Sequence, residues 1–257
     1  ALMQTYPWNV AVVPCLRDNY AYLLWREGEK EAVAIDPSEA APVVEALQER
    51  GLVLREIWLT HHHWDHVGGI EELVARYQPR AVLGSLYDQQ RQRIPSQSQG
   101  LEEGPCAWRF GDDAIEVLAL PGHTLGAIAY RCGKELFTGD TLFLGGCGRV
   151  FEGSMEQMLQ AMEKLRALPG DLRVWCGHEY TLNNLAFARE VEGGNPVLAK
   201  RAELAAALRA SALPTVPGTI AEERATNPFL RWDVEEIAGG EAALASFTRL
   251  RRAKDAF

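Results

Sequence analysis

The chain has 257 residues, 47% of them hydrophobic and 24% charged, which is ordinary for a soluble globular protein with a substantial core. Its net charge of −9 disfavours nucleic acid as the main partner. Five cysteines without close pairing, no signal-peptide pattern and no bilayer-spanning apolar run predict a cytoplasmic protein with structural thiols.

Strand patterns are spread over the first part of the chain. Runs rich in aromatic and branched residues predict short strands there. These runs cover residues 19–25, 31–36, 56–60, 114–120, 127–132, 135–138 and 172–176. The segment 89–104 is polar and rich in Gln, Arg and Gly, so we expect a loop.

Helices are indicated by their caps and by apolar periodicity. Ser38 can cap a helix that stops at Gly51. Residues 70–77 carry apolar side chains at i, i+3, i+4 and i+7. Ser154 and Gln157 form a capping box ahead of a methionine-rich helix. Beyond residue 180 we expect helices at 182–191, 196–213 and 234–252. A strand-rich first part followed by a helical last part predicts a sandwich with a small helical domain.

One short segment concentrates metal-ligand side chains. Residues 60–69 read Thr-His-His-His-Trp-Asp-His-Val-Gly-Gly and contain four of the six histidines. In an extended segment His61, His63 and Asp65 project to the same side, because side chains alternate. His61 and His63 can then bind one ion, while Asp65 and His66 reach a neighbouring ion.

Three more candidate ligands, His123, Asp140 and His178, each follow an apolar run that reads as a strand. Taken singly, each is explained more simply as a turn or cap residue. Together with segment 60–69 they make five histidines and two aspartates, too many for one tetrahedral zinc and suited to two ions. His62 faces away by alternation and receives no metal role. Imidazole and carboxylate ligands suit Zn, Fe or Mn.

These motifs resemble a known family. Thr-His-x-His-x-Asp-His, followed by separate His, Asp and His, resembles the metallo-β-lactamase superfamily. Later segments resemble one of its members, glyoxalase II (hydroxyacylglutathione hydrolase). These segments are Gly-Gly-Cys-Gly-Arg-Val-Phe-Glu-Gly at 145–153, Gly-His-Glu-Tyr-Thr at 177–181, Asn-Pro-Phe-Leu-Arg at 227–231 and Arg-Arg-Ala-Lys-Asp at 251–255.

The resemblance implies a fold and a division into domains. It implies an α/β (α+β) protein, with a metallo-β-lactamase-like αββα sandwich over residues 1–178 that holds the binuclear metal site. It also implies an all-helical C-terminal domain over residues 179–257 that contributes to binding a glutathione thioester.

The resemblance also divides the ligands between two ions, which the residues alone leave open. It implies His61, His63 and His123 for one ion, Asp65, His66 and His178 for the other, and Asp140 as the bridge. Zn is the simplest choice, with Fe or Mn also compatible. The ions would lie about 3.5–4 Å apart and share a hydroxide that acts as the nucleophile. Asp65 and Asp140 are therefore the expected catalytic residues.

The implied reaction is hydrolysis of S-D-lactoylglutathione, and of related 2-hydroxyacylglutathione thioesters, to D-lactate and glutathione. This is the second step of the glyoxalase pathway, which detoxifies methylglyoxal. The thiol of glutathione has a pKa of about 8.5, so its thiolate departs without a strong general acid. No side chain beside the motifs is an obvious general acid. The implied substrate contacts are Arg149, Phe151, Tyr180, Arg251 and Lys254. Phe151 stands where relatives can have Tyr, and we expect a monomer with no membrane or nucleic-acid partner.

Other functions fit part of the pattern. A lactonase or β-lactamase would keep the metal motif without needing the basic C-terminal segment. A persulfide dioxygenase uses one iron, and a flavodiiron protein adds a flavin domain for which the chain has no room. A tRNA-processing nuclease fits poorly with the acidic net charge, and a non-catalytic scaffold should have lost ligands. For the C-terminal cations alone, a solvated helix end that complements the helix dipole is the simpler explanation.

Overall fold

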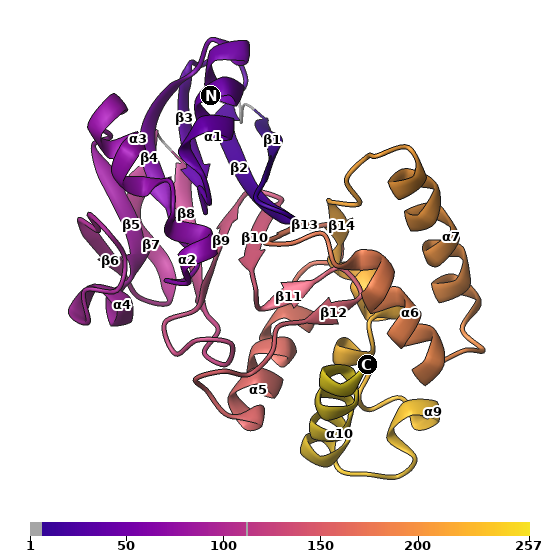
Figure 1. Ribbon diagram of the computed structural model, residues 1–257. Coiled ribbons are helices and arrows are strands. Elements are labelled where there is room, and N and C mark those ends of the chain that lie inside the picture. The colour runs from indigo at the N-terminus through magenta and orange to yellow at the C-terminus, as the bar shows by residue number, and fades with distance from the viewer. Residues whose placement is uncertain (1–6, 112) are drawn as a thin grey trace, which may run out of the picture. The chain divides into compact units, whose positions relative to one another are not determined.

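The computed structural model describes residues 7–111 and 113–257 (Figure 1). Two six-stranded sheets are formed, with strand orders β1-β2-β3-β4-β5-β6 and β14-β13-β10-β9-β8-β7, and a separate hairpin pairs β11 with β12. The chain divides into two compact units. One runs to Leu118 and includes Tyr130–Gly133, and the other comprises Ala119–Ala129 and Lys134–Phe257.

The first unit contains the whole first sheet and four helices. Its strands are β1 (Trp8–Cys15), β2 (Asn19–Arg26), β3 (Glu31–Ile35), β4 (Val53–Trp58), β5 (Ala81–Ser85), β6 (Gln99–Leu101), β7 (Gly104–Phe110) and nearly all of β8 (Asp113–Ala119). Its helices are α1 (Ala40–Arg50), α2 (Trp64–Val67), α3 (Ile70–Tyr77) and α4 (Leu86–Gln90). Strands β1 to β3 are antiparallel, whereas β3 to β6 run parallel.

Both faces of the first sheet are covered within this unit. Helices α1 and α3 lie on one face, where Leu47 and Leu73 join the core formed with Leu54 (Figure 1). On the other face the Trp58 ring stacks on Tyr130, with 5.1 Å between centroids. The strands therefore read as continuous apolar runs, as expected for a sheet buried on both sides.

The second unit holds the remaining strands and the C-terminal helices. Its strands are β10 (Glu135–Gly139), β11 (Leu142–Phe143), β12 (Gly146–Cys147), β13 (Arg173–Cys176) and β14 (Gly218–Thr219), and β9 (Ile128–Cys132) is shared with the first unit. Its helices are α5 (Met155–Arg166), α6 (Thr181–Val191), α7 (Pro196–Ala210), α8 (Ile220–Thr226), α9 (Glu235–Ala238) and α10 (Ala243–Ala256), with a 3₁₀ turn at Pro228–Leu230. Strands β10 and β13 are parallel neighbours.

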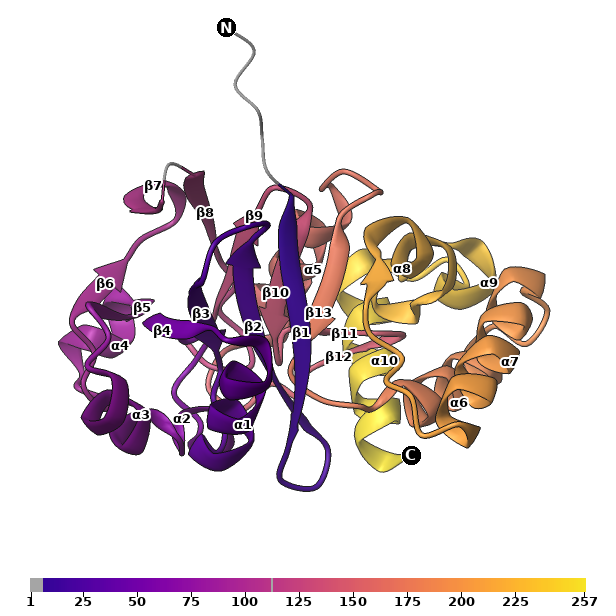
Figure 2. The same cartoon turned by 90° about the horizontal axis from the view of Figure 1, so that it is seen from above.

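The helices of the second unit pack on one another through apolar faces. Helices α6 and α7 lie side by side as a helical hairpin (Figure 2). Helix α10 contacts α5 and the 3₁₀ turn, where Phe247 meets the rings of Phe229 and Trp232. No helix among the described residues is both long enough and apolar enough to cross a membrane.

Most of the expected elements are confirmed, several of them with their caps. The capping box of Ser154 and Gln157 is present at the start of α5. Gly51 ends α1 in the left-handed conformation, with φ 62°. The expected cap of α1 is wrong, because Glu39 is the N-cap residue and the Ser38 hydroxyl donates instead to the carbonyl of Asp36.

Three expectations are corrected. Segment 89–104 is not simply a loop, because it contains β6, which pairs with β5. This pairing uses backbone hydrogen bonds, which the polar side chains of the segment do not prevent. The helix expected over 234–252 is two helices, since Gly239 and Gly240 have φ of 56° and 83°. The C-terminal part is not all helical, because β14 pairs with β13.

Candidate metal and substrate site

The candidate ligands after β4 lie partly in an irregular loop and partly in a helical turn. Residues 61–63 are outside regular structure, and α2 begins at Trp64. Asp65 and His66 are therefore placed by a helical turn, and the expectation that alternation extends to Asp65 is wrong. His62 points to Asp88, with 3.7 Å between Nδ1 and Oδ1. The expectation that His62 has no metal role stays a prediction.

Asp36, which the sequence analysis did not single out, orients two of the histidines. Its carboxylate accepts hydrogen bonds from the Thr60 backbone N–H (2.8 Å) and hydroxyl (2.6 Å), and lies 2.9 Å from His66 Nδ1. A carboxylate only accepts, so His66 Nδ1 carries the proton and its Nε2 keeps a lone pair. The Thr60 hydroxyl, having given its proton to Asp36, accepts from His61 Nδ1 at 3.0 Å. His61 is thereby held in the same tautomer.

Asp65 is held by Asn19, the first residue of β2. The Asn19 side-chain amide donates to the Asp65 carboxylate at 3.0 Å and to its backbone carbonyl at 2.9 Å. Asn19 is buried, so this pair of bonds fixes both the α2 turn and the carboxylate it carries. A single Asn in a strand gave no sequence signal for this role.

In the second unit, His123, Asp140 and His178 come together at strand ends. Strands β10 and β13 are parallel neighbours, so Asp140 and His178 leave the sheet at the same edge. The Asp140 Oδ2 atom lies 3.2 Å from His178 Nε2 and 3.5 Å from His123 Nε2. His123 Nδ1 donates to the Arg149 carbonyl at 2.8 Å, so its Nε2 also keeps a lone pair.

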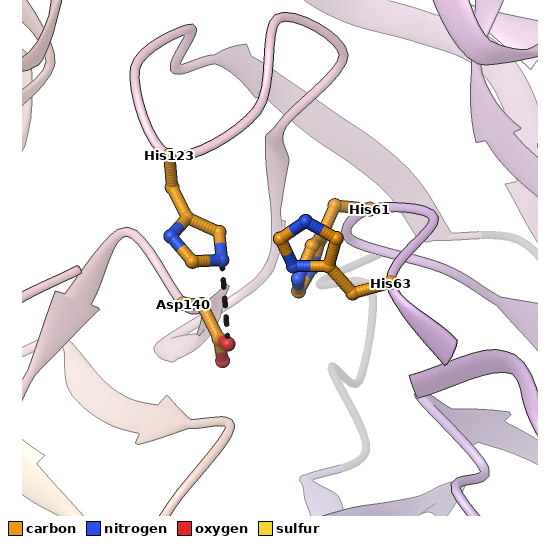
Figure 3. Close-up of side chains that lie close together, drawn as sticks. All are labelled: His61, His63, His123 and Asp140. Carbon is orange, nitrogen blue, oxygen red and sulfur yellow. Dashed lines mark ion pairs between the residues drawn. The ribbon is translucent and has the colours of Figure 1, made fainter. Parts of the chain in front are cut away.

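The candidate ligands form two groups of donor atoms, each within 4.8 Å of one another. One group is His61, His63, His123 and Asp140 (Figure 3), and the other is Asp65, His66, Asp140 and His178. Asp140 belongs to both. A third such group joins Asp36 to His61 and His66, and there the Asp36 carboxylate accepts the hydrogen bonds described above.

The chemistry of these donors fits two divalent ions. Each group offers imidazole nitrogens with one or two carboxylates, the donor set of zinc and of iron or manganese sites. Ligand atoms about 2.1 Å from one tetrahedral ion lie about 3.4 Å apart, well within the spacing found. The protonated Nδ1 atoms of His61, His66 and His123 leave Nε2 as the ligand atom. The sequence thus named every member of both groups.

The aromatic candidates for substrate binding lie beside two of these ligands. The Tyr180 ring stacks on His178, with 4.6 Å between centroids and planes 6° apart. The Phe151 ring lies 5.2 Å from that of His123, and its side chain is exposed. Arg149 is also exposed, with Nε 3.6 Å from an Asp255 carboxylate oxygen. Tyr180 and Phe151 therefore lie beside candidate ligands of the second unit, whereas the Arg149 side chain lies beside Asp255.

The two cations of α10 that were predicted to bind substrate, Arg251 and Lys254, differ from each other. Lys254 is partly buried and donates to the Asn183 side chain; burial, aided by Arg251 and Arg149, lowers the pKa of its ammonium. Arg251 is only 3% exposed; it donates to the Cys147 carbonyl at 2.6 Å and, through Nε, to the Asp255 carboxylate at 3.1 Å. The alternative of a solvated basic helix end therefore does not describe Arg251. Its role toward substrate stays a prediction.

Comparison with known proteins first defines the class. The model of the metallo-beta-lactamase superfamily matches residues 16–178. The crystal structure of ETHE1 from Myxococcus xanthus is similar over 93% of this chain and 90% of that one, with TM-score 0.65 and 26% identity. TTHA1623, solved in a di-iron-bound form, covers 86% of this chain and 100% of its own, with TM-score 0.60 and 27% identity. The expected metallo-β-lactamase fold with a helical C-terminal part is confirmed.

The C-terminal part defines the family within that class. The model described as hydroxyacylglutathione hydrolase C-terminus matches residues 179–257. A hydroxyacylglutathione hydrolase from Synechococcus sp. (strain JA-2-3B'a(2-13)) is 50% identical over 254 residues, which cover 97% of this chain and 100% of the relative. The chain belongs to the hydroxyacylglutathione hydrolase family.

Proposed function

We propose that this protein hydrolyses S-D-lactoylglutathione, and related 2-hydroxyacylglutathione thioesters, to the 2-hydroxy acid and glutathione. The observation that carries the proposal is Asp140, whose carboxylate belongs to both groups of donor atoms. A shared carboxylate suits two ions held close together, the arrangement that activates water for hydrolysis. Full-length relatives that bear the name hydroxyacylglutathione hydrolase supply the substrate class.

The proposed reaction needs no side-chain nucleophile. Water oxygen adds to the thioester carbonyl carbon, the C–S bond breaks, and glutathione leaves as a thiolate. Bound divalent ions would polarise the carbonyl and lower the pKa of the attacking water. Asp65, fixed by its bonds from Asn19, can take up the proton that this water loses. The thiolate departs without a strong acid, because its pKa is about 8.5.

The chain's own side chains account for binding the glutathione part. Its two carboxylates favour cations, which Arg149 and Lys254 supply. The Tyr180 phenol group, fixed by stacking on His178, places a donor next to the metal ligands. Phe151 offers an apolar surface beside His123 and lacks a hydroxyl. Discrimination for glutathione over other thiols would therefore rest on charge and on the Tyr180 hydroxyl.

We propose that each of the two groups of donor atoms would hold one ion, and that Asp140, which belongs to both groups, would serve both ions. Zn is the proposed ion, and Fe or Mn would fit the same donors. We further propose that residues 1–178 form the catalytic domain and 179–257 the helical domain that helps to bind substrate; the residues matched by the two family models support this division. We also propose a reducing, cytoplasmic setting, in which the five cysteines, none of them in a disulfide, would stay as thiols.

The proposal is tested by assaying purified protein on S-D-lactoylglutathione, with metal content measured in parallel. Turnover should be lost after chelation and should return when zinc is added back. Lactones and β-lactams serve as competing substrates, and their turnover should be far slower. If protein with both metal sites filled hydrolyses a lactone but not the thioester, the proposed substrate is contradicted, whereas the proposed metal site is not.

A further inference from the structure

The segment between two of the proposed ligands is held by side chains from the C-terminal helices. This hairpin segment, residues 142–149, follows Asp140 and ends at Arg149, whose carbonyl accepts the proton of His123 Nδ1. We infer that Arg251 is a positioning residue for His123, acting through the last three residues of the hairpin segment. The inference rests on the proposed metal site, but not on the identity of the substrate.

The end of the hairpin segment fits closely against two ligands. A Cβ atom at Gly148 would lie 1.9 Å from the Asp140 carbonyl oxygen and 3.1 Å from His123 Nδ1. The Gly148 backbone N–H donates to the Thr141 carbonyl at 3.1 Å. The peptide that joins Gly148 to Arg149 therefore limits where the next carbonyl, that of Arg149, can lie beside the His123 ring. A shift of this peptide would displace the Arg149 carbonyl, which is the acceptor that keeps the proton on His123 Nδ1.

Arg251 contacts this peptide and the one before it. Its Nη1 lies 2.6 Å from the Cys147 carbonyl and 3.5 Å from the Gly148 carbonyl. Asp255, one helical turn later, accepts a hydrogen bond from its Nε at 3.1 Å, and the guanidinium lies over the Phe229 ring at 5.0 Å. A buried guanidinium with these partners is fixed in place, so it can fix the carbonyls that it bonds.

The same C-terminal helices hold the turn of the hairpin segment. Asn227 donates to the Gly146 carbonyl at 3.0 Å, and the Glu223 carboxylate accepts from the Gly145 N–H at 2.8 Å. Both side chains are completely buried. The Asn-Pro-Phe motif thus acquires a physical role, because Asn227 ties the helical part to the segment that orients His123. Within this network, Arg251 bonds the carbonyls that immediately precede Arg149, whose own carbonyl accepts from His123.

Lys254 provides an internal contrast on the same helix. It lies one turn beyond Arg251, is partly exposed, and bonds to Asn183 rather than to the hairpin segment. The expected effects of removing the two cations therefore differ. Loss of Lys254 should affect substrate binding alone, whereas loss of Arg251 should weaken the ion held by His123. Removing the partner that orients a ligating histidine typically costs about 10–100-fold in metal affinity.

The test measures zinc affinity of the full chain by competition with a chromogenic chelator, with no substrate present. Arg251→Met should weaken one of the two ions about 10–100-fold and leave the other unchanged. Arg252→Met removes an exposed charge from the neighbouring position and should retain both ions, as should Lys254→Met. Wild-type zinc affinity in Arg251→Met would overturn the inference and leave Arg251 as a substrate ligand only.

A double-mutant cycle separates positioning of His123 from a general structural role. If Arg251 acts through His123, then Arg251→Met added to His123→Ala should cause no further loss of zinc affinity. An additive loss would mean that the substitution disturbs the fold, and would contradict the inference. If Arg251→Met does not fold, the same zinc measurement is made on Arg251→Lys. This variant should also bind one ion more weakly, because one ammonium cannot replace both arms of the guanidinium. Failure of thioester hydrolysis would leave these zinc results interpretable.

Discussion

The two halves of the candidate metal site are built in different ways. The loop after β4 concentrates its ligands within residues 61–66 and orients them by side chains of the first unit, chiefly Asp36 and Asn19. His123, Asp140 and His178 stand alone at separate strand ends, and a backbone carbonyl orients His123. Ligands that are neighbours in sequence need only local support, whereas isolated ligands depend on segments distant in the chain.

The sharpest test of this comparison is to remove the ligand that both groups share. Asp140→Ala should lose both ions and lower kcat/KM by at least about 10³-fold, because two-ion activation of water is lost. His63→Ala, which belongs to one group, should lose one ion and retain the other. Metal analysis of both variants after dialysis decides the matter. Equal losses from the two substitutions would contradict the sharing of Asp140.

The local support of the first half can be broken at Asp36. Asp36→Ala should weaken metal binding about 10–100-fold, because His66 loses the acceptor that fixes its tautomer. It should also lower the free energy of unfolding by about 1–3 kcal/mol, since the buried Thr60 donors lose their partner. Chelator competition and chemical denaturation measure the two effects. The exposed Glu49→Ala on α1 is the control, and a similar effect there would dismiss the proposed role.

A smaller effect is expected where substrate, and not metal, is bound. Lys254→Met should raise KM for S-D-lactoylglutathione about 10-fold, the lower end of the value of a hydrogen bond to a charged group, because Lys254 is partly exposed, while metal content stays constant. The pKa of Lys254 is lowered by burial, so its charge is lost at a lower pH than for an ordinary lysine. KM should therefore rise with alkaline pH in the wild type. A pH profile of KM that Lys254→Met leaves unaltered would exclude this source of the effect.

The smallest expected effect concerns Phe151. Phe151→Tyr adds a hydroxyl to an exposed ring beside His123. If that hydroxyl reaches the substrate, KM should fall about 2–10-fold, the value of one hydrogen bond, with kcat nearly unchanged. Steady-state kinetics with matched metal loading would measure it. An unchanged KM would place the ring outside the substrate site.

Sequence patterns predicted the strands and the ligand types well, because both depend on local properties. Short apolar runs located β2, β3, β9, β10 and β13 within a few residues. All seven residues of the two groups of donor atoms had been predicted as candidate ligands, because His and Asp side chains close to strand ends can be recognised in the sequence. The helical turn at Trp64 was missed, because four residues are too few to show periodicity.

The supporting residues could not be predicted in the same way. Asp36 was predicted only as the last residue of a strand, and its role depends on the packing of β3 beside β4. Arg251 reads as one of several solvated cations, and only the fold shows that it is buried against the hairpin segment. Such roles arise from contacts between residues that are distant in the chain, 24 positions apart for Asp36 and Thr60 and 104 for Arg251 and Cys147, and a single sequence does not record such contacts.

The most direct test of the central claim is a zinc titration of the metal-stripped protein, with S-D-lactoylglutathione hydrolysis followed at each addition. Two groups of donors that share Asp140 predict that activity rises steeply only as the second equivalent binds, and levels off at two ions per chain. Full activity at one equivalent, with no further change at the second, would contradict the two-ion account.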